Sequence, residues 1–255
     1  MPAPLNRLKQ RLARGEVLHG IWLGLADPYA AEIAATADFD WLLIDGEHAP
    51  NDLRSLSAQV AVLAGKAPAP VLRLPDDDPA RIKQALDIGV QSLLIPMVDS
   101  AEQAARALRA TRYAPQGIRG VGAGLARASG WGAVPDYVAT ANDQICLIVQ
   151  VESVAGLAAL NDILAVPGLD GVFIGPADLA ADMGHAGQST HPEVRAAVTD
   201  ALRRIRAAGR AAGMLSTDPG FVAECVAAGA NFVGVGIDVT TLAQGLRDLA
   251  RHWRG

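Results

Sequence analysis

The segment ICLIVQVESVAGLAALNDILAVPGLDGVFIGP, residues 145–176, contains two short apolar runs separated by a stretch in which apolar residues are spaced differently. The runs at 145–152 and 169–176 have the length and composition of buried strands. Residues 153–166 between them carry apolar side chains at helical spacing, and Ser153 is a residue type that often precedes a helix. The segment therefore predicts two parallel strands joined by a helix.

The same alternation extends along the whole chain. The runs that read as strands are 19–25, 39–45, 69–75, 91–98, 145–152, 169–176, 210–217 and 231–238. Continuously apolar strands are typical of a parallel sheet covered by helices, and eight strand–helix units predict an α/β fold of the (β/α)8 TIM barrel type. We expect a single domain over residues 1–255. A doubly wound sheet is the alternative, but the glycine-rich segment 120–125 lacks the spacing of a dinucleotide-binding turn and follows a helix.

One connection is longer than a barrel normally contains. Residues 114–144, rich in Gly and Ala, separate the fourth predicted helix from the fifth predicted strand. Long loops without secondary structure are uncommon inside compact domains and are usually functional or mobile. Because this one starts at the end of the barrel opposite the expected active site, we expect it to reach a partner subunit or to fold around the rim.

Composition excludes several classes of function. The chain is 51% hydrophobic and 19% charged, with a net charge of −5, and its 22 basic residues form no cluster suited to nucleic acid. The N-terminal residues lack the apolar core of a signal peptide, and no apolar stretch is long enough to span a membrane. We therefore expect a soluble cytoplasmic protein that binds neither nucleic acid nor membrane.

In a (β/α)8 barrel, the side chains that react with substrates lie at the C-terminal ends of the strands and in the loops that follow. The polar residues at these places are mostly acidic, with one arginine and one histidine. They are Asp45, Glu47, His48, Arg73, Gln150, Glu152, Asp178, Ser216, Thr217 and Asp218.

Glu152 and Asp178 follow adjacent predicted strands, so both carboxylates should face the same end of the barrel. Two carboxylates completed by water and substrate oxygens suit a hard divalent cation such as Mg²⁺ or Mn²⁺. The alternative is that each carboxylate caps the helix that follows it.

The segment around His48 allows several interpretations. Asp45, Glu47 and His48 could form a metal cluster, or Asp45 could orient the imidazole of His48 as a general base. His48 could also be an ordinary surface histidine. Arg73 ends an apolar strand, where a guanidinium needs an anion or a structural ion pair.

The lysines argue against imine chemistry. Lys9, Lys66 and Lys83 are the only three in the chain, and all fall on predicted helices or helix ends. A Schiff-base lysine would have to project into the active site. Metal-assisted proton transfer next to a carbonyl is the chemistry that remains.

Several segments together resemble the class II hydroxy-oxo-acid aldolases, the family of 4-hydroxy-2-oxoheptanedioate aldolase and 2-dehydro-3-deoxyglucarate aldolase within the aldolase/citrate lyase family. They are LLIDGEHAPND (42–52), RLP (73–75), IKQALDIGVQSLLIPMVDSAEQA (82–104), RYAPQGIRG (112–120), VQVES (149–153) and GVFIGPADLA (171–180). The resemblance covers about residues 18 to 238. It implies a TIM barrel whose last helix is exchanged between subunits of a homo-hexamer, a trimer of dimers.

The resemblance also implies roles for individual residues. Glu152 and Asp178 would bind Mg²⁺, Mn²⁺ or Co²⁺, with Gln150 lining the site and Glu47 lying behind the ligands. The backbone N–H groups around Ala177 and Asp178 would hold the pyruvate carboxylate. Arg73 would stabilise the enolate oxygen, and His48, oriented by Asp45, would move the proton. Family members often carry Ser at the position of Ala177, so we expect altered acid recognition here.

The implied reaction is a reversible retro-aldol cleavage by a carbon–carbon lyase. Removal of the proton from the 4-hydroxyl group of a 4-hydroxy-2-oxo acid breaks the C3–C4 bond, leaving a metal-bound pyruvate enolate and an aldehyde. In aromatic catabolism, 4-hydroxy-2-oxoheptanedioate would give pyruvate and succinate semialdehyde. The alternatives are a citrate-lyase-like or malyl-CoA-lyase-like enzyme acting on a CoA thioester, and a non-catalytic barrel that binds a 2-oxo acid.

Overall fold

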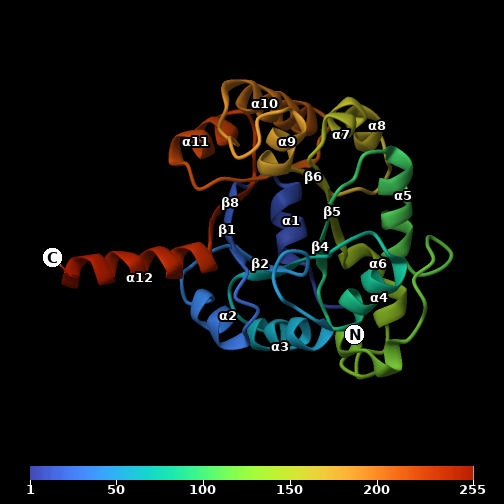
Figure 1. The fold of residues 1–255 in the computed structure, drawn as a ribbon. Helices are drawn as coiled ribbons and strands as arrows, with labels where there is room; N and C mark the ends of the chain where they lie inside the picture. Colours follow the sequence, from blue (N-terminus) through green and yellow to red (C-terminus); the bar gives the residue numbers. More distant parts are fainter. Residues whose placement is uncertain (255) are drawn as a thin grey trace.

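The computed structural model describes residues 1–254 and contains a closed barrel of eight parallel strands, which pair in chain order with β8 next to β1 (Figure 1). This confirms the predicted (β/α)8 fold. Gly255, the last residue of the predicted domain, lies outside the described residues. The strands are β1 (Leu18–Leu23), β2 (Trp41–Asp45), β3 (Ala69–Arg73), β4 (Ser92–Ile95), β5 (Cys146–Val151), β6 (Gly171–Ile174), β7 (Ala211–Leu215) and β8 (Phe232–Ile237).

Helices surround the barrel, and most begin at a capping side chain. Asp27, Asp52, Ser100 and Asp218, for example, each accept a hydrogen bond from the backbone of the first turn that follows. The predicted helix 153–166 is divided into two short helices, α7 and α8. The helices are α1 (Arg7–Ala13), α2 (Pro28–Ala34), α3 (Leu53–Leu63), α4 (Pro79–Asp87), α5 (Ala101–Ala110), α6 (Tyr137–Gln144), α7 (Val154–Ala158), α8 (Leu160–Leu164), α9 (Pro176–Asp182), α10 (Pro192–Ala207), α11 (Pro219–Ala227) and α12 (Asp238–Arg254).

The interior of the barrel is filled by aromatic side chains. Trp41 stacks on Phe232 with ring centroids 4.2 Å apart, and Trp22 packs against Phe173 at 5.4 Å. Gly20 on β1 leaves room for Trp41, since a Cβ at this position would lie 2.1 Å from the indole ring. A second apolar layer lies between the strands and the helices around them.

The N-terminal helix α1 lies across the bottom of the barrel, where the strands begin, and is seen in the middle of the ring of strands in Figure 1. Leu8 and Leu12 of α1 pack against the interior cluster. The side chain of Asn6, at the start of the helix, donates to Ser92 Oγ at 3.0 Å and to the carbonyl of Gln144 at 3.0 Å. This buried amide ties the first residues of the chain to its middle.

Residues 114–144 are not the structureless loop that their length and composition suggest. They contain two 3₁₀ turns, Ala123–Leu125 and Arg127–Ser129, followed by α6. Tyr137 packs in a cluster with Ala3 and Tyr113, which fastens the segment to the N-terminus. The segment therefore folds around the bottom rim of the barrel, one of the two expected arrangements.

Helix α12 leaves the barrel and extends away from it (Figure 1). Its described residues include none that is buried. A stripe of large apolar side chains lies exposed along it, consisting of Leu242, Leu246, Leu249 and Trp253. None of the helices in residues 1–254 combines the length and apolar character that crossing a bilayer requires.

We predict that Gly20→Ala destabilises the protein, because the added methyl group overlaps the ring of Trp41. Overpacking of this kind costs about 1–3 kcal/mol, so for a chain of this length we expect Tm to fall by at least about 2 °C in differential scanning calorimetry. Gly124→Ala is the matched control, since no atom lies within 4 Å of a Cβ built there. An unchanged Tm for Gly20→Ala would contradict the tight interior packing.

Candidate active site

A cavity of about 490 Å³ opens at the C-terminal end of the barrel. One part of its lining is polar and includes Asp45, His48, Arg73, Gln150 and Asp178. Another part is apolar, formed by Trp22, Phe173, Leu215 and Ile237. The barrel therefore brings most of the predicted site residues together, since they follow different strands that end at this face.

Arg73, at the end of β3, is the central charge of the cavity. Its Nε and Nη2 donate to the two carboxylate oxygens of Asp45 at 3.0 and 2.6 Å, and its Nη1 lies 2.9 Å from Glu47 Oε2. Arg73 is only 8% exposed and Asp45 only 5%. A buried guanidinium needs paired carboxylates to offset its lost hydration. Arg73 therefore forms a structural ion pair with these acids. It also lines the cavity, where it could face a bound anion.

Asp45 contacts His48 differently from the prediction. Besides Arg73, its carboxylate accepts hydrogen bonds from the backbone N–H groups of Glu47 (3.0 Å) and His48 (3.3 Å). The imidazole of His48 is 67% exposed, and its Nε2 lies 3.7 Å from Glu47 Oε2. The expected contact between Asp45 and the His48 ring is thus corrected, because the buried guanidinium takes both oxygens of Asp45. Glu47 is the carboxylate that stands beside the imidazole.

Gly46 separates these residues for a steric reason. Its backbone N–H donates to the carbonyl of Arg73 at 2.8 Å, and a Cβ on Gly46 would lie 2.6 Å from the same oxygen. The close approach of the β2 and β3 ends therefore requires glycine. It also keeps Asp45 in register with Arg73 across the two strands.

Glu152 lies just beyond β5 and is almost fully buried. Its Oε1 accepts from the backbone N–H of Met97 at 2.8 Å, and its Oε2 accepts from the side chain of Gln150. Burial, with a smaller contribution from Asp178 and Glu47, raises the pKa of Glu152 to about 7. The raised pKa indicates that no positive side chain among the described residues lies close enough to stabilise the charged form of Glu152.

Asp178 lies in the first turn of α9, next to Ala177, and lines the cavity. It is close enough to raise the pKa of both Glu152 and Glu47. The first amides of a helix have no acceptor within that helix, so the backbone of this turn offers donors to an anion. Glu152 and Asp178 therefore lie near one another, although only Asp178 lines the cavity itself.

The donor set around Glu152 suits a hard divalent cation. Two carboxylates and the amide oxygen of Gln150, which is buried and has no hydrogen-bond partner among the described residues, are all oxygen ligands. Gly175 keeps the space open, because a Cβ there would lie 2.6 Å from Glu152 Oε2. The residues present thus fit the metal that the family resemblance implies.

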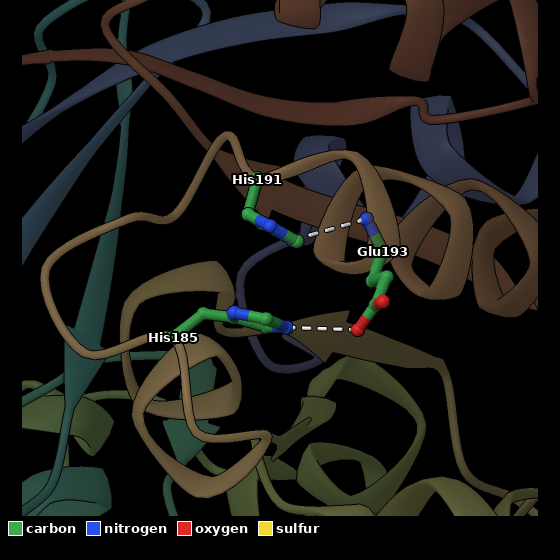
Figure 2. A group of neighbouring side chains, drawn as sticks. All are labelled: His185, His191 and Glu193. Carbon is green, nitrogen blue, oxygen red and sulfur yellow. Dashed lines mark hydrogen bonds and ion pairs between the residues drawn. The ribbon is translucent and has the colours of Figure 1, made fainter.

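A second group of metal-ligand types, His185, His191 and Glu193, lies in and after the connection between α9 and α10 (Figure 2). His185 Nε2 lies 2.8 Å from Glu193 Oε2, and His191 Nδ1 accepts from the backbone N–H of Glu193. The two imidazoles stack with centroids 3.6 Å apart and planes 17° from parallel, so their in-plane lone pairs do not converge on one point. These contacts join the loop to the start of α10, and Ser189 and Thr190 of the same loop line the cavity.

Some residues of the site are not apparent from the sequence. Met97 has a left-handed backbone, with φ of 54°, which directs its N–H to Glu152. Trp22 and Phe173 read as ordinary strand residues, although both reach the cavity. Ser189 and Thr190 belong to a loop with no strand near it in the chain. Only the position of Trp22 and Phe173 near strand ends could have suggested their role.

Comparison with known proteins gives a consistent result. Residues 18–245 match the family model described as HpcH/HpaI aldolase/citrate lyase. A hydroxypyruvate/pyruvate aldolase of Roseovarius nubinhibens is 60% identical over 254 residues, covering 100% of this chain and 99% of the relative. A 4-hydroxy-2-oxo-heptane-1,7-dioate aldolase of Klebsiella pneumoniae is 53% identical, covering 97% and 94%.

Among solved structures, a HpcH/HpaI aldolase/citrate lyase family protein from Burkholderia cenocepacia superposes with a TM-score of 0.93 at 41% identity, covering 98% of this chain and 100% of that one. The family suggested by the sequence motifs is thereby confirmed. The fold, the matched length and the named relatives agree, and this chain belongs to the HpcH/HpaI aldolase/citrate lyase family as a carbon–carbon lyase.

Proposed function

We propose that the protein is a metal-dependent pyruvate aldolase that cleaves 4-hydroxy-2-oxo acids reversibly to pyruvate and an aldehyde. The observation that carries this proposal is the convergence, at one end of the barrel, of the buried Arg73 and the two carboxylates Glu152 and Asp178. Relatives named for hydroxypyruvate, pyruvate and 4-hydroxy-2-oxo-heptane-1,7-dioate support the substrate class. The substrates we favour are 2-oxo acids as donors and short aldehydes, including succinate semialdehyde, as acceptors.

Glu152 and Asp178 would hold the cation, with Gln150 beside them. A divalent cation such as Mg²⁺, Mn²⁺ or Co²⁺, when bound there, supplies a Lewis acid that polarises the 2-oxo group of the substrate. The hydrogen bond from Met97 fixes one oxygen of Glu152, which limits the orientations of this carboxylate. Backbone N–H groups in the first turn of α9, at Ala177 and Asp178, would donate hydrogen bonds to the substrate carboxylate without needing a serine hydroxyl.

Arg73 would stabilise negative charge on the oxygen of the enolate. Asp45 and Glu47 together contact all three nitrogens of the guanidinium, but its five N–H donors outnumber these three contacts. The remaining donors can therefore act on charge that develops during C–C cleavage. Fixed donors of this kind need no reorganisation when the charge appears, which is the main source of electrostatic catalysis.

His48 would take the proton from the 4-hydroxyl group. It lies at the edge of the cavity, where its exposed ring can exchange protons with solvent, and Glu47 lies beside it. Asp45 fixes the backbone of His48 and holds Arg73, so it would position both groups without touching the substrate. The apolar wall of Trp22, Phe173 and Leu215 would exclude water from the reacting carbonyl.

The cavity gives less support to the alternatives. A CoA thioester would require several basic residues for its phosphates, whereas Arg73 is the only lysine or arginine among the lining residues. A non-catalytic barrel that only binds a 2-oxo acid would not need an exposed imidazole next to the bound acid.

We also propose that α12 is exchanged between subunits of a homo-oligomer, a hexamer built as a trimer of dimers. The stripe on α12 is spaced so that Leu242, Leu246, Leu249 and Trp253 share one face of the helix. An apolar face of this length is stabilised when it is buried on another chain. The described structure of one chain provides no surface that covers it.

We expect the purified protein with Mg²⁺ or Mn²⁺ to release pyruvate from a panel of 4-hydroxy-2-oxo acids that differ in the length and charge of the aldehyde portion. EDTA should abolish the reaction because it removes the Lewis acid, and added metal should restore it. A coupled lactate dehydrogenase assay measures the pyruvate. Absence of pyruvate from every substrate, or release that persists in EDTA, would refute the metal-dependent aldolase.

His48→Ala should lower kcat by at least about 100-fold, the usual contribution of a general base. Its affinity for Mn²⁺, measured by isothermal titration calorimetry, should stay within about threefold of wild type because the ring is not a proposed ligand. His19→Ala, which removes an exposed histidine from the start of β1, is the control and should leave kcat unchanged. Loss of Mn²⁺ binding in His48→Ala would instead make His48 a metal ligand.

Leu246→Asp should shift the protein from its oligomer to smaller species in sedimentation velocity, because it places a charge in the centre of the apolar stripe of α12. Gln244→Asp introduces the same acid on another face of the same helix and should not change the sedimentation coefficient. If both variants have the sedimentation coefficient of the wild-type oligomer, the apolar stripe of α12 is not buried between subunits.

A further inference from the structure

A second cavity, of about 430 Å³, lies at the bottom of the barrel, away from the active-site cavity. It is bounded by α1, the end of α5, α6 and the turn that precedes β6. Four basic side chains line it, and only two acidic ones do. The basic residues are Lys9, Arg109, Arg112 and Arg210, and the acidic residues are Asp143 and Asp170.

The acids do not neutralise the arginines. Asp170 lies 3.3 Å from Lys9 Nζ, and its other oxygen accepts a hydrogen bond from the backbone of Leu147 at 2.8 Å. Asp143 is exposed at the cavity edge. Within residues 1–254, none of the three arginines has a carboxylate oxygen within 4.0 Å, whereas Arg73, Arg119 and Arg195 each have one at 2.9 Å or less.

The hydrogen bonds of two of these guanidinium groups, those of Arg112 and Arg210, are also weak or incomplete. Arg112 Nη1 lies 3.5 Å from the carbonyl of Ile145, and Arg210 Nη2 lies 3.3 Å from that of Val166, both long for charged donors. The Nε of Arg210 is buried without a partner among the described residues. Burial lowers the pKa of Arg112, with only partial compensation from Asp170 and Asp143. A positive charge in this position lacks a counter-ion.

We propose that this bottom cavity binds a compact dianion between Arg109, Arg112 and Arg210. The ligand would be a phosphoryl group or a small dicarboxylate, since both offer several oxygens to guanidinium groups in paired geometry. The volume matches that of sites for small molecules. Because the cavity contacts α1 through Lys9 and α6 through Asn142, a bound anion would also strengthen the attachment of these helices to the barrel.

Isothermal titration calorimetry with inorganic phosphate and, separately, with succinate tests the proposal on the full-length protein. Arg109→Gln, Arg112→Gln and Arg210→Gln should each weaken binding by at least about tenfold, because hydrogen bonds to charged groups contribute this much or more. Arg54→Gln removes an exposed arginine from α3 and should leave the Kd within about twofold of wild type. Comparison of the two titrations distinguishes a phosphoryl ligand from a dicarboxylate.

Arg112 and Arg210 are both partly buried, so circular dichroism must show that their variants fold. If a variant does not fold, anion binding is judged from Arg109→Gln. Arg109 is exposed on α5, so removing its guanidinium group should leave the core intact. Binding of either anion that is weakened by the cavity variants and not by Arg54→Gln supports the proposal. Failure of both anions to bind at 10 mM (~10⁻² M), or binding that the cavity variants leave unchanged, overturns it. Pyruvate release is not the readout, so this result stands apart from the proposed aldolase activity.

Discussion

The buried pairing of Arg73 with Asp45 organises the C-terminal end of the barrel. The two residues occupy matched positions at the ends of β3 and β2, so the ion pair holds the strand ends in register as well as neutralising charge. An arginine this buried would be strongly destabilising if the carboxylate were removed. Gly46 lets the two strands approach closely enough for the pair to form. The position of His48 then follows, because its backbone is bound to the same carboxylate.

Once Arg73 is neutralised by Asp45 and Glu47, the cavity contains acids without a matching cation. Burial raises the free energy of the charged form of Glu152, and the nearby carboxylate of Asp178 adds to this effect. Such a site disfavours an anionic substrate until a positive ion is present. In the proposed aldolase, this electrostatic balance would favour binding of the cation before the 2-oxo acid.

The barrel could be predicted because each strand is continuously apolar and each helix is clearly delimited. Gln150, Glu152 and Asp178 could be located in the site because they follow strands that end at one face. The partner of Asp45 could not be predicted, since the choice between His48 and Arg73 depends on the register of a neighbouring strand. The left-handed backbone conformation of Met97 could not be predicted either, because methionine has no preference for positive φ. The fold of residues 114–144 depends on contacts with the N-terminus, far away in the chain.

The way α1 closes the bottom of the barrel bears on how the chain folds during synthesis. The side chain of Asn6 donates a hydrogen bond to the carbonyl of Gln144. The side-chain amide of Asn231 donates one to the carbonyl of Leu12. Contacts this distant in sequence form slowly, because a long loop must close before any of them contributes. Helix α1 therefore completes its docking only after β8 has been synthesised, so we expect Leu8 and Leu12 to be buried late in folding.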